Sequence, residues 1–174
     1  MDDDQPSLIL TVAVETPQWH DVLQNGDTLC REAANATLTL ARPDLVEGEI
    51  SVVLTDDEEV RSLNHRWRHK NKPTNVLSFP GVDLVPGEPL PSLPGGILLG
   101  DVVLALETVQ REAEAEGKRL ADHVRHLVTH GVLHLLGYDH QTEAEASVME
   151  GVETRVLAGL GIDDPYAMPV EDAA

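Results

Sequence analysis

Short apolar segments alternate along the chain with longer segments of helical character, and this alternation restricts the possible folds more than any other feature. The strand-like segments are residues 7–15, 49–55, 74–79 and 97–104. They are rich in Val, Ile and Leu, and the first alternates apolar with polar residues as a half-buried strand does. Because strands interleaved with helices pack in layers, we expect an α+β (α/β layered) fold, with a small four-stranded mixed sheet packed with about five helices.

Capping and breaking residues delimit the expected helices. Thr55 and Thr142 are each followed by a glutamate three positions later, which is the pattern of a capping box at a helix start. Gly117 and Gly137 are placed to close helices at their C-termini. The expected helices cover residues 19–41 with a break or delay at Asn25-Gly26, 55–67, 107–116, 119–136 and 142–160.

The chain of 174 residues has the length of one domain and shows no clear internal boundary. Aromatic residues make up only 3% of it, so the core must be built from Leu, Val, Ile and Ala. Residues 80–96 hold five prolines and four glycines, which predicts a long exposed loop. We expect one domain over residues 1–174, with an acidic and flexible tail from about residue 161.

Features that the sequence lacks predict the cellular compartment of the protein. No uncharged apolar run approaches the roughly 20 residues that a membrane helix needs. The first residues, Met1 to Asp4, carry negative rather than positive charge, unlike a secretory signal peptide. The single cysteine, Cys30, cannot form an internal disulfide. We therefore expect a protein of the reducing cytoplasm that does not enter a membrane.

The formal net charge of −19 argues against a nucleic-acid partner, but the cations are not evenly spread. Five of the 12 Lys and Arg residues lie between positions 61 and 72. A local basic patch on an acidic body can still bind an anion, whereas composition by itself favours a solvated helix end. The five cations are Arg61, Arg66, Arg68, Lys70 and Lys72, with His65 and His69 among them.

Three histidines around a glycine form the most informative motif of the chain. His130 and His134 lie four positions apart on an expected helix, which places their side chains on one face, about 5–6 Å apart at Cβ. Gly137 allows a turn with positive φ, after which His140 can return to the same ion. Three neutral imidazoles with an open fourth position are typical of a catalytic zinc. The sequence therefore predicts one zinc ion bound by these three histidines.

The spacing H-x-x-x-H-x-x-G-x-x-H is also that of the metzincin proteases, so we expect a zinc-metalloprotease-like fold. Those enzymes carry a glutamate base where this chain has Gly131, which disfavours peptide hydrolysis by their route. His126 lies about 12 Å from His134 along the helix axis, too far to share one ion easily. We interpret His126 as a supporting or core residue and His123 as solvent-facing.

Three motifs follow one another along the chain. The first has two parts: residues 63–68 read L-N-H-R-W-R, and residues 72–80 read K-P-T-N-V-L-S-F-P. The second is L-G-D at residues 99–101, and the third is H-G-V-L-H-L-L-G-Y-D-H at residues 130–140. In this order the motifs resemble the pattern of the YbeY family of bacterial rRNA maturation factors, and the similarity covers residues 63–140, with compatible elements on either side. Asn75 stands where many members of the family have Asp.

The resemblance implies a zinc-dependent single-strand endoribonuclease. Such an enzyme would mature the 3′ end of 16S rRNA and act in ribosome biogenesis and quality control. His130, His134 and His140 would bind the metal, and Arg68 and His130 would be catalytic. The implied partners are single-stranded and ribosomal RNA, small-subunit proteins and an assembly GTPase, with neither DNA nor a membrane among them.

The chemistry of RNA cleavage is compatible with these residues. A metal held by three imidazoles can polarise a phosphoryl oxygen or activate water. The guanidinium of Arg68 can fork onto two phosphate oxygens and stabilise the negative charge that develops during cleavage. Without the resemblance, a salt bridge to a carboxylate would be the better interpretation of Arg68.

Several neighbouring residues admit two roles. Thr74, Ser78 and Asp101 could orient substrate or support the metal ligands, although Asp101 fits a hydrogen bond at the strand–helix junction better. Tyr138 and Asp139 could stack on a base or fix His140, or simply form the turn.

Two other functions remain open. A non-catalytic, zinc-binding ribosome assembly factor is consistent with the missing glutamate at position 131 and with the acidity of the chain, because acidic proteins tend to meet basic ribosomal proteins. A zinc hydrolase of peptides or small esters is less favoured, since it would need Asp101 or Asp139 in place of that glutamate.

Overall fold

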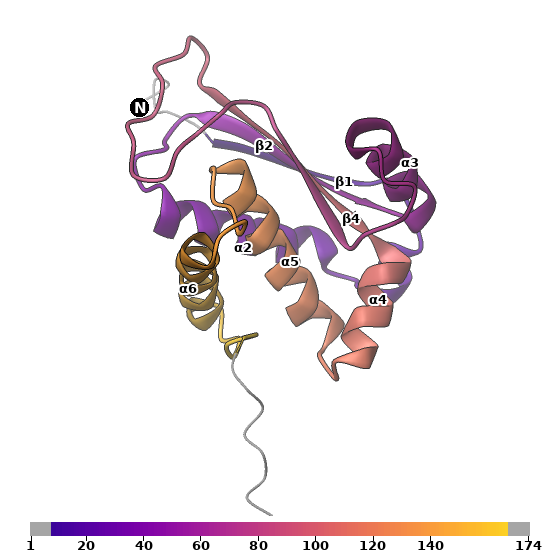
Figure 1. Ribbon diagram of the computed structural model, residues 1–174. Helices are drawn as coiled ribbons and strands as arrows, with labels where there is room; N and C mark the ends of the chain where they lie inside the picture. The colour runs from indigo at the N-terminus through magenta and orange to yellow at the C-terminus, as the bar shows by residue number, and fades with distance from the viewer. Residues whose placement is uncertain (1–7, 167–174) are drawn as a thin grey trace, which may run out of the picture.

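The predicted strands form one mixed sheet in the computed structural model, which describes residues 8–166 (Figure 1). The strand order is β1-β2-β4-β3. β1 pairs with β2 and β2 with β4 in parallel, whereas β3 runs antiparallel to β4. The bounds are Leu8–Val14 for β1, Gly48–Thr55 for β2, Val76–Pro80 for β3 and Ile97–Ala105 for β4. The expected four-stranded mixed sheet is confirmed.

Six helices accompany the sheet within the described residues, and the first is a single turn. The break expected at Asn25-Gly26 is present, since residues 23–25 separate the first two helices. Gly117 and Gly137 follow α4 and α5 with positive φ, as predicted for closing glycines. The helices are α1 (Trp19–Val22), α2 (Gly26–Ala41), α3 (Asp57–Arg68), α4 (Leu106–Ala115), α5 (Leu120–Leu135) and α6 (Glu143–Gly159).

One predicted helix cap is wrong by one residue. The N-cap of α3 is Asp56, whose Oδ1 accepts a hydrogen bond from the backbone N–H of Glu59 at 2.8 Å. Thr55 cannot serve because it is the last residue of β2 and is buried. The cap predicted at Thr142 is confirmed, because its Oγ1 accepts from the N–H of Glu145 at 3.1 Å.

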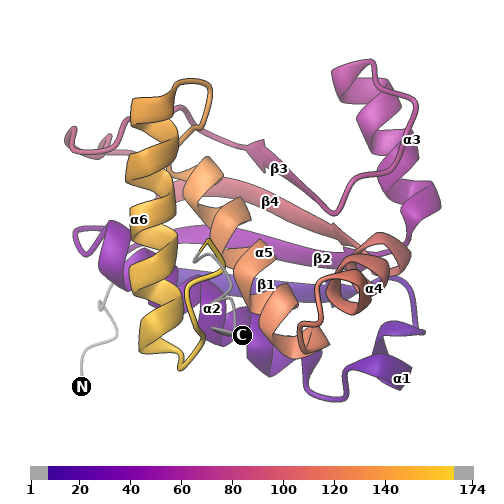
Figure 2. The same ribbon diagram turned by 60° about the horizontal axis from the view of Figure 1, so that its bottom comes forward.

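The two faces of the sheet are covered unequally (Figures 1 and 2). Helices α2 and α5 lie across one face and enclose the main core, and α6 packs against them from outside. On the opposite face α3 covers a small apolar cluster formed by Val60, Leu77, Val103 and Ala105. The main core is almost wholly aliphatic, as the low aromatic content predicts.

The loop predicted at residues 80–96 contains no helix or strand after Pro80, but it is not exposed along its whole length. Leu84 is only 9% exposed and belongs to the main core. The guanidinium of Arg42, itself buried, donates hydrogen bonds to the backbone oxygens of Val85 and Glu88. The loop is therefore exposed over most of its length, as predicted, but Leu84 and the contacts with Arg42 attach it to the domain.

The segment after α6 is described as far as Tyr166 and is attached to that helix. Ile162 N–H donates to the carbonyl of Leu157, and Thr154 Oγ1 donates to Asp164 at 3.1 Å. The remainder of the acidic tail that we expected to be flexible, residues 167–174, lies outside the described residues. Among residues 8–166, no helix combines the length and apolar character needed to cross a membrane.

Helix α5 lies close against the sheet at Gly131. A Cβ atom at this position would lie 2.5 Å from Cγ1 of Val102 on β4 and 3.2 Å from Oγ of Ser78 on β3. The Ser78 hydroxyl donates a hydrogen bond to the Gly131 carbonyl at 2.9 Å. The glutamate that metzincins carry here has no room in this packing.

We expect Gly131→Ala to destabilise the metal-free protein by about 1–2 kcal/mol, because overpacking against Val102 outweighs the gain in helix propensity. Gly151→Ala on α6 is the matched control, since no atom lies within 4 Å of its added Cβ. That change should stabilise the protein by up to about 1 kcal/mol. Urea unfolding with a chelator present measures both, and equal effects of the two changes would contradict the close packing.

Candidate metal centre and adjoining cleft

The three predicted metal ligands come together at the C-terminal end of α5. His130 and His134 lie on the helix, and His140 returns beside them after the turn that follows it. One ring nitrogen from each lies within 4.8 Å of the others, and the Nε2 atoms of His130 and His134 are 3.1 Å apart. Three convergent imidazole nitrogens form a set that could hold a transition metal.

The turn that returns His140 depends on Gly137. This residue has φ 96°, as the sequence predicted, and a Cβ there would lie 2.0 Å from the carbonyl oxygen of Leu84. A residue with a side chain at this position would therefore have a strained backbone and would clash with the 80–96 loop. Leu84 and Pro86 of that loop thus pack against the turn that returns His140.

The surroundings of His134 favour its neutral imidazole. Burial, followed by the neighbouring rings of His130 and His140, lowers the pKa of His134 from 6.5 to about 4. His134 is therefore uncharged near pH 7, which is the form that binds metal.

A buried carboxylate on α6 is the functional residue that sequence reasoning missed. Glu153 is 0% exposed, and its Oε1 lies 2.6 Å from Nδ1 of His130. Its Oε2 lies 2.9 Å from Nε2 of His126 and accepts a hydrogen bond from the Tyr166 hydroxyl at 2.5 Å. A signal was present in the sequence, because helical periodicity places Glu153 on the same face as buried Met149 and Leu157.

The remaining histidines of α5 lie outside the cluster. His126 contacts Glu153, which is compatible with its interpretation as a supporting or core residue. The interpretation of His123 as solvent-facing is wrong: it is 4% exposed, and its Nε2 lies 3.0 Å from Oε1 of Glu112. The same carboxylate accepts a hydrogen bond from Asn75, which ties the start of β3 to α4 and α5. An aspartate at position 75 would place its carboxylate beside that of Glu112, and the two negative charges would repel each other.

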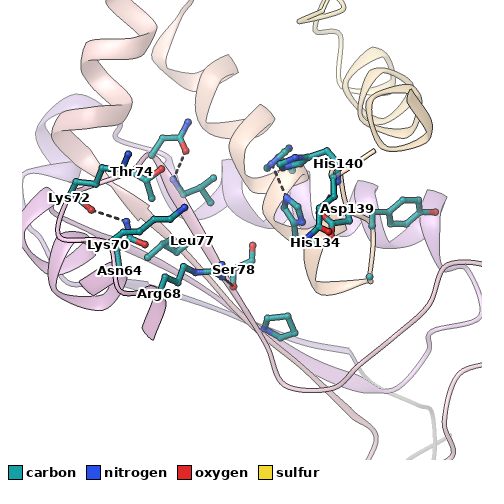
Figure 3. A pocket seen from close by; sticks show the side chains of 17 residues that line it. Asn64, Arg68, Lys70, Lys72, Thr74, Leu77, Ser78, His134, Asp139 and His140 are labelled. Atoms are coloured by element: carbon teal, nitrogen blue, oxygen red, sulfur yellow. Dashed lines mark hydrogen bonds between the residues drawn. The ribbon is translucent and has the colours of Figure 1, made fainter. Parts of the chain in front are cut away.

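The histidine cluster opens onto a cleft of about 820 Å³. Figure 3 shows Arg68, Lys70 and Lys72 on one side and His134 and His140 on the other. The first wall comes from the end of α3 and the segment leading into β3, and the second from the end of α5 and its turn. The cleft thus has a cationic wall on one side and a cluster of imidazole nitrogens on the other, on an otherwise acidic protein.

Contacts with two residues of β3 hold the Arg68 side chain in place. Its Nη2 donates to the backbone oxygen of Ser78 at 2.7 Å, and its guanidinium lies 5.6 Å from the ring centre of Phe79. Within residues 8–166 Arg68 forms no ion pair, so the salt bridge that composition alone favoured is not present. The guanidinium keeps further N–H groups for an anion in the cleft.

The neighbouring polar residues separate into two groups. Thr74, Ser78, Tyr138 and Asp139 all line the cleft. Asp101 does not, because the alternation of β4 directs it to the face of the sheet opposite α5, beyond the part that α3 covers, where it accepts a hydrogen bond from Ser51. Neither role considered for Asp101 is correct, and it is too remote to replace the protease glutamate.

A layered α+β domain with a three-histidine cluster facing a cationic cleft defines an enzyme class suited to phosphate esters. The family described as Endoribonuclease YbeY matches residues 13–161. The chain belongs to this family of endoribonucleases.

Curated relatives and a solved structure agree with this assignment. The chain is 49% identical over 160 residues to the protein named Endoribonuclease YbeY of Paramagnetospirillum magneticum, covering 90% of this chain and 94% of the relative. A protein of the same name from Azorhizobium caulinodans is 49% identical, with 93% and 98% covered. The solution structure of TM1509 from Thermotoga maritima has the same fold, with a TM-score of 0.56 and 19% identity over 92% of this chain and 100% of that one.

The lowered pKa of His134 predicts how stability depends on pH. Unfolded His134 takes up a proton near pH 6.5, whereas the native residue resists protonation down to about pH 4. The free energy of unfolding of the metal-free protein should therefore fall as the pH drops through this window. Urea unfolding at pH 7, 6 and 5 should show a smaller fall for His134→Gln than for the parent. His20→Gln, on the exposed turn α1, should behave like the parent; identical slopes in all three would contradict the assignment.

Proposed function

We propose that this chain is a zinc-dependent endoribonuclease that cleaves single-stranded RNA and matures the 3′ end of 16S rRNA. Family membership supports hydrolysis of RNA phosphodiester bonds. The observation that carries the proposal is the position of Arg68 and the three histidines on opposite walls of one cleft (Figure 3).

The donor set fits one zinc ion per chain. His130, His134 and His140 offer three nitrogens within reach of one another, and His134 is neutral near pH 7. When bound in such a site, zinc acts as a Lewis acid and activates water. His130 contributes to the proposed chemistry as one of these ligands.

The cations that line one wall of the cleft explain how the site can bind the phosphates of an RNA substrate. Arg68 is held by Ser78 and presents free N–H groups, so it can fork onto a phosphate that spans the cleft. Lys70 and Lys72 line the same wall and can follow the phosphates of adjacent nucleotides. Tyr138, half-buried beside the cluster, offers a ring against which an unpaired base can stack.

The cellular role follows from the family resemblance and the charge distribution. A protein with a net charge of −19 is poorly attracted to naked RNA, so basic partners must help to deliver the substrate. Small-subunit ribosomal proteins and an assembly GTPase in the cytoplasm are such partners. We place the activity in ribosome biogenesis and quality control.

A non-catalytic assembly factor is the second candidate. The observation that favours it is Gly131, because the site lacks the glutamate base that metzincin proteases carry at this position and has no room for one. The same observation counts against a hydrolase of peptides or small esters. Of the two carboxylates that could replace that base, only Asp139 lines the cleft, and its Oδ1 accepts the backbone N–H of His140.

Metal content tests the proposed centre. Protein purified without a histidine tag should contain about one zinc per chain by plasma mass spectrometry, as a three-imidazole site predicts. A variant with His130, His134 and His140 all replaced by alanine should contain none. His20→Ala should retain the parental metal content. A parent that neither contains metal nor takes it up after addition would argue for a structural role of the histidines.

Arg68→Ala should reduce cleavage of a single-stranded RNA on the order of 100-fold, because the charge that develops on the phosphoryl group loses its bidentate partner. Arg68→Lys should recover only part of the rate, since an ammonium cannot fork. Arg66→Ala is the matched control, on the same helix and outside the cleft, and should cleave like the parent. If Arg68→Ala cleaves like the parent, or if a nuclease-free parent has no activity but retains ribosomal proteins, the assembly-factor function is favoured instead.

A further inference from the structure

Glu153 combines complete burial with a position directly behind a proposed metal ligand. The carboxylate comes from α6 and reaches the side of the His130 ring that faces away from the cluster. Its Oε1 is 2.6 Å from Nδ1 of His130, while Nε2 of the same ring lies 3.1 Å from His134. The two nitrogens of His130 therefore face different partners: a carboxylate on one side and the cluster on the other.

The carboxylate is surrounded by groups that can donate hydrogen bonds. Oε1 faces Nδ1 of His130, and Oε2 faces Nε2 of His126 and the Tyr166 hydroxyl, an environment that suits the acceptor oxygens of an ionised carboxylate. Burial and the bond to Glu153 raise the pKa of Tyr166, so the phenol stays a neutral donor. A charged carboxylate can only accept hydrogen bonds. Nδ1 of His130 must then be the donor, which leaves the lone pair on Nε2.

We infer that Glu153 is a positioning residue that holds the proton of His130 on Nδ1 and fixes the ring so that Nε2 faces the metal centre. This inference rests on the proposed metal site. Carboxylates that orient ligand histidines in this way raise ligand basicity and metal affinity. His130 is the member of the cluster that is supported like this, since among the described residues neither His134 nor His140 has a carboxylate bonded to its ring.

The carboxylate is itself held in place by two further elements. His126, one turn before His130 on α5, lies 2.9 Å from Oε2. Tyr166 reaches the same oxygen from beyond α6, and its ring packs edge-on against His126 with centroids 5.6 Å apart. With Oε2 fixed by two donors, Oε1 has little freedom to leave His130.

The inference is tested first on the metal-free protein. At pH 8, long-range ¹⁵N correlations of the imidazoles report which nitrogen of His130 carries the proton. We expect the Nδ1–H form in the parent and in Glu153→Gln, whose amide oxygen can still accept the bond. We expect it to be lost in Glu153→Ala. A parent with the Nε2–H form, or a Glu153→Ala variant that keeps the parental form, would overturn the inference.

Zinc affinity, measured by competition with a chromophoric chelator, is the second readout. Glu153→Ala should bind zinc on the order of 10- to 100-fold more weakly than the parent, and Glu153→Gln should recover part of that loss. Glu150→Gln, which removes a charge from the same helix outside the network, should bind like the parent. Val156→Ala, which loosens the buried face of α6, should lose stability but not affinity.

The outcomes separate this inference from the proposed function. If the parent does not bind zinc, the metal centre fails, and the ¹⁵N measurement still decides what Glu153 does to His130. If the parent binds zinc and both Glu153 variants bind it equally well, the positioning role alone is overturned. If Glu153→Ala does not fold, Glu153→Gln is compared with Val156→Ala instead. Equal losses of zinc affinity in these two variants would be explained by general loosening of α6 and would overturn the positioning role of Glu153.

Discussion

The contact between α5 and the strands at Gly131 holds the two halves of the site together. The hydroxyl of Ser78 donates to the backbone of α5, and the carbonyl of Ser78 accepts from Arg68. One residue of β3 thus fixes both the helix that carries the histidines and the guanidinium across the cleft. The missing side chain at position 131 allows this approach, because Val102 occupies the space. A glutamate at position 131, where metzincins carry their base, is therefore incompatible with this close contact between α5 and the sheet.

Charge is organised locally rather than over the whole molecule. The chain is strongly acidic, yet Arg68, Lys70 and Lys72 line one wall of the cleft and form no ion pairs among the described residues. The interior carboxylate, Glu153, is matched by donors on both oxygens. The cations of the cleft are free to contact a polyanion, whereas the buried charge of Glu153 is satisfied by hydrogen bonds inside the domain.

Local features were predictable from the sequence, and packing across the sheet was not. His130, His134 and His140 could be grouped because helix periodicity and one glycine turn bring them together within a short stretch. Asp101 was misplaced because its face of β4 depends on which side the helices cover. The link from Ser78 to α5 joins distant segments, so no local pattern indicates it. Helical periodicity could have predicted that Glu153 is buried, but a single glutamate among apolar residues is easily interpreted as exposed.

The two walls of the cleft differ in how much of the chain must be ordered to build them. The histidine wall is almost self-contained: its residues adjoin along the chain, and closing so short a loop costs little conformational entropy. The arginine wall meets it only through β3 and α5, whose contact at Ser78 and Gly131 spans 53 residues. One helix and one turn are therefore enough to bring the three histidines together, although the carboxylate behind His130 comes from α6. The position of Arg68 opposite them depends on the topology of this sheet.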